Sequence, residues 1–296
     1  MSVDAKGVIH DIGYQRYDGP RLGRWYAVRS LYAHGLRTAY GLGRSAKAKA
    51  FPWIVVGLVF MIAAVLTAIR AQTGRAQLMY WEFPAAVSLF VILFCATVAP
   101  ELVSRDMRGG VLPLYFSRPL TRYDYALAKL AALITALFGL LAGPQLLIFV
   151  GGAFSVDGMS AVWHEFLDFA SGLAVAGVTA VVFGSLALLV ASLAGRRAVA
   201  AAMIVALFVI TTPIYGVLMG LAYSGSQNGN LTGASATMSQ LAGLVSPMIL
   251  VDGVGQWWFA AKSMPGPYGP VYGLVALGLV VVSVLLLLVR YRKVAR

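Results

Sequence analysis

Residues 101–129 read ELVSRDMRGGVLPLYFSRPLTRYDYALAK, and a long apolar run lies on each side of them. The stretch contains five of the 23 Lys and Arg residues of the chain and three of its 11 acidic residues. A polar loop between two apolar runs must lie in water, because a bilayer core offers no partners to its backbone groups. We therefore expect this loop to be the part of the chain that meets a soluble partner.

The composition is that of a membrane protein. Of 296 residues, 60% are hydrophobic and 11% are charged, and the mean hydropathy is +0.81. A soluble domain carries about 25% charged residues. The single cysteine, Cys95, lies inside an apolar run, which excludes an intrachain disulfide and predicts a small core residue. No apolar signal-peptide core occurs in residues 1–50, so we expect the first span to act as an uncleaved anchor.

Six segments approach the roughly 20 residues that a spanning helix needs. The sequence therefore predicts an all-α integral membrane domain over residues 51–290, with six transmembrane helices. The predicted spans are residues 51–69, 84–101, 127–150, 169–194, 199–222 and 270–290.

The basic residues predict how these spans are oriented. With six spans, 20 of the 23 Lys and Arg residues fall on one side, and only Arg70, Arg75 and Lys262 fall on the other. Positive charge accumulates on cytoplasmic loops. We therefore expect a multi-pass protein of the plasma membrane, bacterial in origin, with both termini in the cytoplasm. Because topology accounts for the net charge of +12, no nucleic-acid partner is expected.

Three segments outside the spans complete the predicted organisation. Residues 1–20 form a polar cytoplasmic segment, and residues 291–296 form a basic cytoplasmic tail. Residues 21–50 contain a helical pattern in which aromatic and Arg side chains mix, and this pattern favours an amphipathic helix in the lipid headgroup layer. The alternative is an ordinary cytosolic helix that packs on a partner.

Residues 223–268 form the outer region before the last span. Residues 236–261 are apolar enough to resemble a seventh span, but a seventh crossing would place the basic tail outside. Breaker and polar residues also weaken a straight spanning helix here. We therefore expect a re-entrant or surface helix with its tryptophans at the lipid interface, where membrane lipids would contact it. Its key residues are Ser246, Pro247, Asp252, Trp257 and Trp258.

The predicted spans hold no ionisable residue away from their ends. Transporters driven by protons or sodium use carboxylates near the midplane, so this class is disfavoured. Polar and helix-breaking residues do occur in two spans, and they mark either a translocation path with hinges or static kinks inside the bundle. These residues are Pro144, Gln145, Thr211, Thr212, Pro213 and Tyr215.

Motifs for catalysis are missing from the sequence. It contains no phosphate-binding G-x-x-x-x-G-K-[S/T] loop, no H-E-x-x-H pair and no grouped metal ligands. We therefore expect a chain that is not an enzyme and has no catalytic residues, no metal and no cofactor of its own.

The pattern E-x-x-S-R-D-x-R-x-G-x-L-x-x-x-x-S-R-P-x-x-R-x-x-Y, which begins at Glu101, resembles a known family. It is similar to the cytoplasmic loop of ABC-2 type transporter permeases, the membrane subunits of type V ABC exporters. The six spans, the amphipathic helix before the first span and the broken outer helix also resemble that family, so the likeness covers most of the chain.

The resemblance implies a coupling helix near residues 110–117, seated in a groove of a separate ATPase subunit. Apolar residues would anchor in the groove, and arginines would pair with acidic residues of the ATPase or of the loop itself. Pro113 departs from the family pattern. The implied coupling residues are Glu101, Arg105, Asp106, Arg108, Gly110, Leu112, Leu114, Phe116, Ser117, Arg118, Pro119 and Arg122.

Two functions follow as hypotheses. In the first, the chain is the permease of an ABC exporter for a lipophilic or amphipathic substrate. It would pair with a second permease, as a homodimer or with a sister chain, and with two ATPase copies that hold ATP and Mg²⁺. In the alternative, the chain is a non-transporting membrane scaffold or sensor that recruits a cytosolic protein through residues 101–129.

Overall fold

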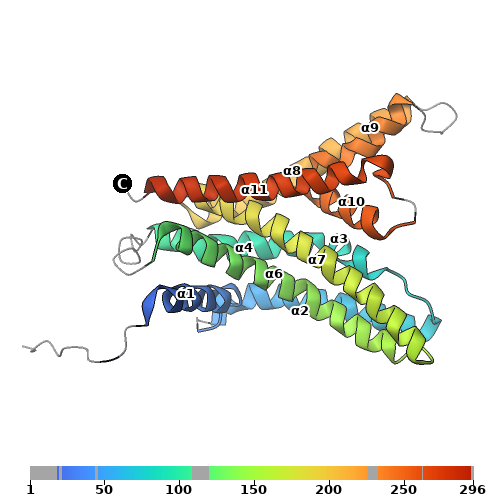
Figure 1. The fold of residues 1–296 in the computed structure, drawn as a ribbon, viewed down its shortest axis with the longest axis horizontal. Helices are drawn as coiled ribbons and strands as arrows, with labels where there is room; N and C mark the ends of the chain where they lie inside the picture. The colour runs from blue at the N-terminus through green and yellow to red at the C-terminus, as the bar shows by residue number, and fades with distance from the viewer. Residues whose placement is uncertain are drawn as a thin grey trace, which may run out of the picture.

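The computed structural model describes residues 19, 22–43, 46–108, 120–225, 233–261 and 263–294. Within these ranges the chain is helical and contains no strand, and the helices form one elongated bundle (Figure 1). The helices are α1 (Gly23–Ala39), α2 (Ala46–Thr73), η1 (Tyr80–Glu82), α3 (Phe83–Ala86), α4 (Ser88–Arg108), α6 (Arg122–Ala153), α7 (Met159–Leu193), α8 (Arg197–Ser224), α9 (Ala234–Ala242), η2 (Gly243–Val245), α10 (Pro247–Phe259), η3 (Gly266–Tyr268) and α11 (Gly269–Val294).

The lengths and composition of the helices are consistent with a multi-pass membrane protein. Five described helices, α2, α6, α7, α8 and α11, are long and apolar enough to cross a membrane, and the total is seven if each of two bent helix pairs is one span. One bent pair joins η1 and α3 to α4 at an angle of 57°. The other joins α9 and η2 to α10 at 117°. The layout with six spans stays a prediction.

Two predicted spans differ from the observed helices. The span expected at 84–101 is broken at Val87, which lies between the end of α3 at Ala86 and the start of α4 at Ser88. The fourth span begins at Met159 instead of residue 169, so Trp163 and Asp168, which were expected in a loop, lie on α7. The residues before 169 lack an apolar pattern, but they continue the same helix beyond its most apolar stretch.

Helices α6 and α7 form the centre of the bundle. Of the most apolar stretch of α7, 61% is buried, against 17–22% for α2, α8 and α11. Small residues allow close packing here, since a Cβ atom at Gly184 of α7 would lie only 3.1 Å from Ile134 Cγ1 of α6. Cys95 is fully buried in this core, as expected. Helices α2, α8 and α11 therefore keep open apolar faces.

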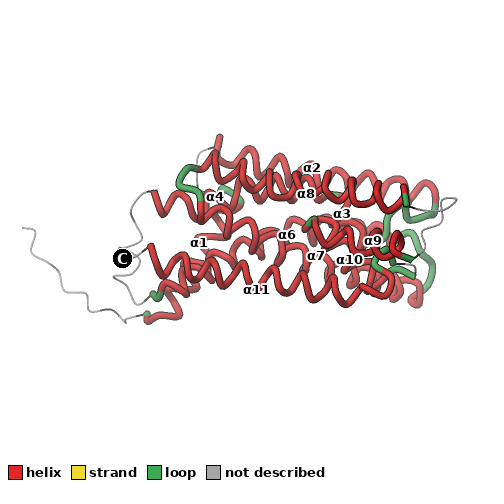
Figure 2. The backbone as a smooth tube through the Cα atoms, turned by 90° about the horizontal axis from the view of Figure 1, so that it is seen from above, coloured by secondary structure: helices red, strands yellow, loops and turns green. Residues whose placement is uncertain are grey.

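The bundle has two ends that differ in chemistry. We call the first the Arg-rich end: it holds α1, the start of α6 and the end of α11, where Arg122 Nη1 donates to the Arg292 carbonyl at 2.9 Å. We call the second the Glu165 end: it holds the end of α2, η1 and the start of α7. The views in Figures 1 and 2 place these groups at opposite ends of the long axis.

Helix α1 is shorter than the predicted interfacial helix. It ends at Ala39, and a turn follows in which Gly41 and Gly43 adopt positive φ angles of 65° and 81°. Residues 46–50, expected to belong to the same segment, already form the start of α2.

One side of α1 packs along the first half of α6. A Cβ atom at Gly35 would lie 2.9 Å from Ala132 Cβ, and the Tyr40 hydroxyl donates to the Ala136 carbonyl at 2.9 Å. The other side exposes Trp25 and Tyr26. Helix α1 therefore packs on the bundle through one side and exposes aromatic residues on the other, and its amphipathic character and its position in the headgroup layer stay predictions.

The outer region forms a sharply bent helix pair. Ser246 has an extended backbone between η2 and α10, and Pro247 occupies the first turn of α10, where its missing N–H costs no hydrogen bond. Helix α8 ends and α11 begins at the Glu165 end (Figure 1), so the chain enters and leaves this region on one side. This arrangement favours a re-entrant pair over a seventh crossing.

Candidate functional site

The predicted coupling loop is attached to the bundle at the Arg-rich end. Helix α4 continues to Arg108, seven residues past the predicted end of the second span. Residues 109–119 lie outside the described part of the chain, and so do the side chains of residues 104–108. The coupling helix and the predicted pairs of its arginines therefore stay predictions. What the structure describes is how the two sides of this loop are held. The coupling residues outside the description are Arg105, Asp106, Arg108, Gly110, Leu112, Leu114, Phe116, Ser117, Arg118 and Pro119.

The side before the loop is held by Glu101. Its carboxylate forms an ion pair with Arg197, the first residue of α8, and the Glu101 side chain is only 9% exposed. This contact joins α4 to α8. The sequence pattern suggested loop arginines as partners of Glu101, whereas Arg197 was considered only as a topology charge.

The side after the loop is held by the start of α6. Thr121 and Asp124 form a capping box: Asp124 N donates to Thr121 Oγ1 at 3.2 Å, and Thr121 N donates to Asp124 Oδ2 at 2.9 Å. Arg24 of α1 donates to both oxygens of Asp124 at 2.8 Å, and these hydrogen bonds raise the pKa of Arg24. Together with the bond from Arg122 to Arg292, these contacts fix α6 to α1 and α11.

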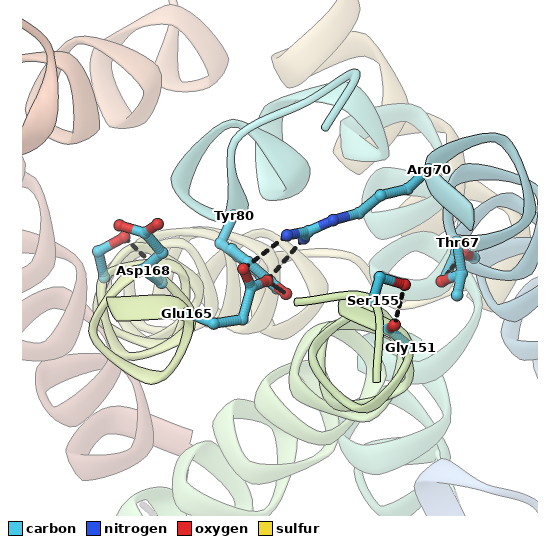
Figure 3. Close-up of polar contacts among 9 residues, drawn as sticks. Thr67, Arg70, Tyr80, Gly151, Ser155, Glu165 and Asp168 are labelled. Atoms are coloured by element: carbon cyan, nitrogen blue, oxygen red, sulfur yellow. Dashed lines mark hydrogen bonds and ion pairs between the residues drawn. The ribbon is translucent and has the colours of Figure 1, made fainter. Parts of the chain in front are cut away.

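The Glu165 end contains a buried ion pair that the sequence did not reveal. Arg70 of α2 donates from Nη1 and Nη2 to the two carboxylate oxygens of Glu165, each at 2.6 Å (Figure 3). The Tyr80 hydroxyl donates to Glu165 Oε1 as well. The side chains of Arg70 and Glu165 are only 13% and 7% exposed. The pair thus joins α2, η1 and α7 inside the protein.

A glycine makes room for this pair. A Cβ atom at Gly152 of α6 would lie 2.5 Å from Glu165 Oε1 and 2.7 Å from Arg70 Nη1, which is closer than atoms approach without a shift. The available sequence signal was one cation and one carboxylate near the ends of two predicted spans. Only the fold shows that these two residues meet.

The predicted path residue Gln145 lies on α6, seven residues before Gly152, and is fully buried. Its side-chain oxygen and nitrogen have no hydrogen-bond partner among the described residues. A Cβ atom at Gly172 of α7 would lie 2.5 Å from Gln145 Oε1 and 2.9 Å from the Tyr80 carbonyl oxygen. Gln145 therefore packs between α6, α7 and η1 instead of lining an open path, and α6 continues as a helix through Pro144.

The predicted hinge residues of α8 contact the outer region. Thr211 Oγ1 donates to Ser246 Oγ at 3.3 Å, and the Tyr215 hydroxyl lies 3.5 Å from Met264 Sδ. Helix α8 continues through Pro213. The structure thus brings together two groups that the sequence analysis kept apart, so a movement of α8 would carry the outer region with it.

Within the outer region, Asp252 is held by its own helix. Gln256 Nε2 donates to Asp252 Oδ2 at 2.8 Å, and Gln256 Oε1 accepts from Met264 N at 2.9 Å. Trp257 packs so closely on α11 that a Cβ atom at Gly273 would lie 3.2 Å from its ring. Trp258 is 45% exposed. The place of these tryptophans at a lipid interface stays a prediction.

No protein-family model matches this chain, and no curated protein matches its sequence. Among the described residues, no three His, Cys, Asp or Glu side chains come together as a metal site would require. The geometry therefore offers two places to consider for function, which are the attachment of the 109–119 loop at the Arg-rich end and the surroundings of the buried ion pair at the Glu165 end.

Proposed function

We propose that this chain is the transmembrane permease subunit of an ABC exporter and that a separate ATPase subunit binds its 101–129 loop. In this proposal the chain crosses the plasma membrane of a bacterium six times, and the Arg-rich end faces the cytoplasm. ATP and Mg²⁺ are held by two copies of the ATPase. A second permease completes the transporter.

The proposal is carried by the attachment of the 109–119 loop. Before the loop, Glu101 pairs with Arg197 and so connects α4 to α8. After the loop, Arg122 bonds to Arg292 and Asp124 bonds to Arg24, which connects α6 to α11 and α1. A force applied to the loop by a partner would thus reach five helices directly. Rigid-body movement of packed helices is a usual way for such a force to open or close a path.

The open faces of the bundle support a partner inside the membrane. Helices α2, α8 and α11 bury only 17–22% of their most apolar stretches, so each has a face for lipid or for another permease. Apolar faces of this kind also suit a lipophilic or amphipathic substrate. A transporter driven by an ion gradient is less well supported. Among the described residues, the one buried Arg–Glu pair is Arg70–Glu165, and its two charges already bind each other.

The first test is a pull-down of the chain from mild detergent, followed by mass spectrometry of the proteins that come with it. A stoichiometric partner with a phosphate-loop lysine motif is expected. The variant Leu112→Asp/Phe116→Asp should then lose this ATPase, because charged side chains cannot seat in an apolar groove. Leu22→Asp is the matched control, since Leu22 is an exposed apolar residue of the same end and lies outside the loop.

Retention of an active ATPase by the Leu112→Asp/Phe116→Asp variant would refute the coupling role of this loop. A wild-type preparation that carries a different cytosolic protein, and no ATPase in several detergents, would favour the scaffold or sensor instead.

A further inference from the structure

An open groove of about 860 Å³ lies at the Glu165 end, between η1, the first turns of α7 and the end of α10. Its volume falls within the roughly 300–1,000 Å³ of small-molecule sites. It is separate from the coupling loop, which lies at the other end of the bundle. The residues that give the groove its chemistry are Trp81, Glu82, Asp168, Ser171, Gln256 and Phe259.

The charged residues that line the groove are acidic. Asp168 is exposed, and no described residue donates a hydrogen bond or an ion pair to its carboxylate. Both terminal nitrogens of Arg70 bind Glu165, and Asp168 lies apart from that pair (Figure 3), so Arg70 makes no direct contact with the Asp168 carboxylate. His164 lies one turn earlier on α7 and outside the lining.

Glu82 supplies the second carboxylate in a fixed position. Its Oε2 accepts from Met79 N at 2.8 Å, which holds the side chain at the start of η1. Asp252 lies nearby on α10, bonded to the lining residue Gln256, and adds negative charge behind the groove. No Lys or Arg lines the groove among the described residues.

Apolar surface lies beside these carboxylates. Phe259 and Leu167 are 41% and 48% exposed although both are large apolar side chains, and Trp81 contributes an aromatic ring. Exposed apolar surface beside polar groups is typical of ligand grooves. Aromatic rings also attract cations through their π-faces, most strongly in the case of Trp. A ligand that satisfies both features carries positive charge and apolar bulk in one molecule.

We propose that this groove binds an amphipathic organic cation, with its charged centre at Asp168 and Glu82 and its apolar part against Trp81 and Phe259. Binding of this kind needs no ATPase and no transport. The inference therefore stands or falls separately from the proposed function.

The test measures binding of tetraphenylphosphonium to the full-length chain in uncharged dodecyl maltoside, by equilibrium dialysis. Saturable binding is expected for the wild type. Asp168→Asn should weaken it roughly tenfold, because one charge–charge attraction near the protein surface is lost. Asp168→Asn/Glu82→Gln should weaken binding further, and Gln at position 82 keeps an oxygen that can accept from Met79 N.

Two controls separate the groove from general partitioning. Asp157→Asn neutralises an exposed carboxylate in the turn between α6 and α7 and should leave the affinity unchanged. Tetraphenylborate has nearly the same shape as tetraphenylphosphonium and the opposite charge, so it should show no saturable binding. Equal binding of the two ions, or an affinity that Asp168→Asn does not lower, would overturn the proposal.

The measurement is repeated with Lys262→Ala, because Lys262 follows the lining residue Ala261 and lies outside the described residues. Absence of saturable binding both in the wild type and in Lys262→Ala would also overturn the proposal.

Added phosphatidylethanolamine then identifies the natural source of the cation. Competition assigns the groove to an ammonium lipid headgroup, and lack of competition assigns it to a free organic cation; either result supports a cation site.

Discussion

At the Arg-rich end, Arg24 pairs with Asp124 while the Arg24 side chain stays 59% exposed; at the Glu165 end, Arg70 and Glu165 pair while only 13% and 7% exposed. Both pairs are bidentate, so geometry does not separate them. Their solvent environments do. An exposed pair adds little to stability because water already solvates both charges. A buried pair becomes costly as soon as one partner is removed, because the other charge remains without solvent.

This difference indicates where the molecule can move. At the Arg-rich end, water already reaches Arg24, which is 59% exposed, so the contact between α1 and α6 can open at smaller cost when another protein binds. At the Glu165 end, Arg70 and Tyr80 both donate hydrogen bonds to Glu165, and Gly152 packs closely against the pair. We therefore expect α2, η1 and α7 to move as one unit at that end.

The largest effect is expected from Glu165→Ala. Arg70 would remain buried without its partner, so the free energy of unfolding should fall by roughly 3–5 kcal/mol. Equilibrium unfolding of the purified chain in mixed micelles measures this change. The double variant Arg70→Met/Glu165→Leu should recover most of the loss, since it removes both charges and keeps side chains of similar size. A loss for Glu165→Ala no greater than for Asp157→Ala would show that the pair is not effectively buried.

A smaller loss is expected from Gly172→Ala, which tests the packing around the pair. The added Cβ atom would lie 2.5 Å from Gln145 Oε1 and 2.9 Å from the Tyr80 carbonyl, so η1 must move away from α7. The expected loss is about 1–3 kcal/mol. Gly177→Ala is the matched control on the same helix, because nothing lies within 4 Å of its Cβ position. It should gain up to about 1 kcal/mol from helix propensity, and equal losses for the two variants would contradict this account.

The smallest effect is expected from Arg24→Gln at the Arg-rich end. The melting temperature in micelles should fall only slightly, and the difference from wild type should shrink as salt is added, because salt screens exposed charges. Arg29→Gln changes another exposed arginine of α1 and serves as the control. If Arg24→Gln lowered stability as much as Glu165→Ala, the contrast between the two ends would fail.

The sequence predicted most of the helices but misjudged some of their limits. The apolar runs that predicted spans at 51–69, 127–150, 199–222 and 270–290 lie inside α2, α6, α8 and α11. The start of α7 at Met159 was missed because residues 159–168 lack the apolar run by which the span at 169–194 was predicted. The break at Val87 was missed because Phe83–Ala86 and Ser88 onward are equally apolar.

Among the residues of the candidate sites, those in a local motif were predicted from the sequence, and those that meet only in the fold were missed. Glu101 and Arg122 were selected from a local motif, and both lie at the same end of the bundle. Gln145 was selected because it is polar within a span, yet it packs beside Tyr80 and Gly172. Arg70 was considered only as a topology charge and Glu165 was not selected, because residues 95 positions apart form no local pattern.

Hydropathy predicted the approximate positions of the long helices and their capacity to cross a membrane, because both depend on the transfer of local segments between water and an apolar phase. The tertiary structure alone decided which charges meet, which glycines must stay small and where a groove opens. Those features depend on distances between segments far apart in the chain, and packing sets these distances only when all the helices are in place.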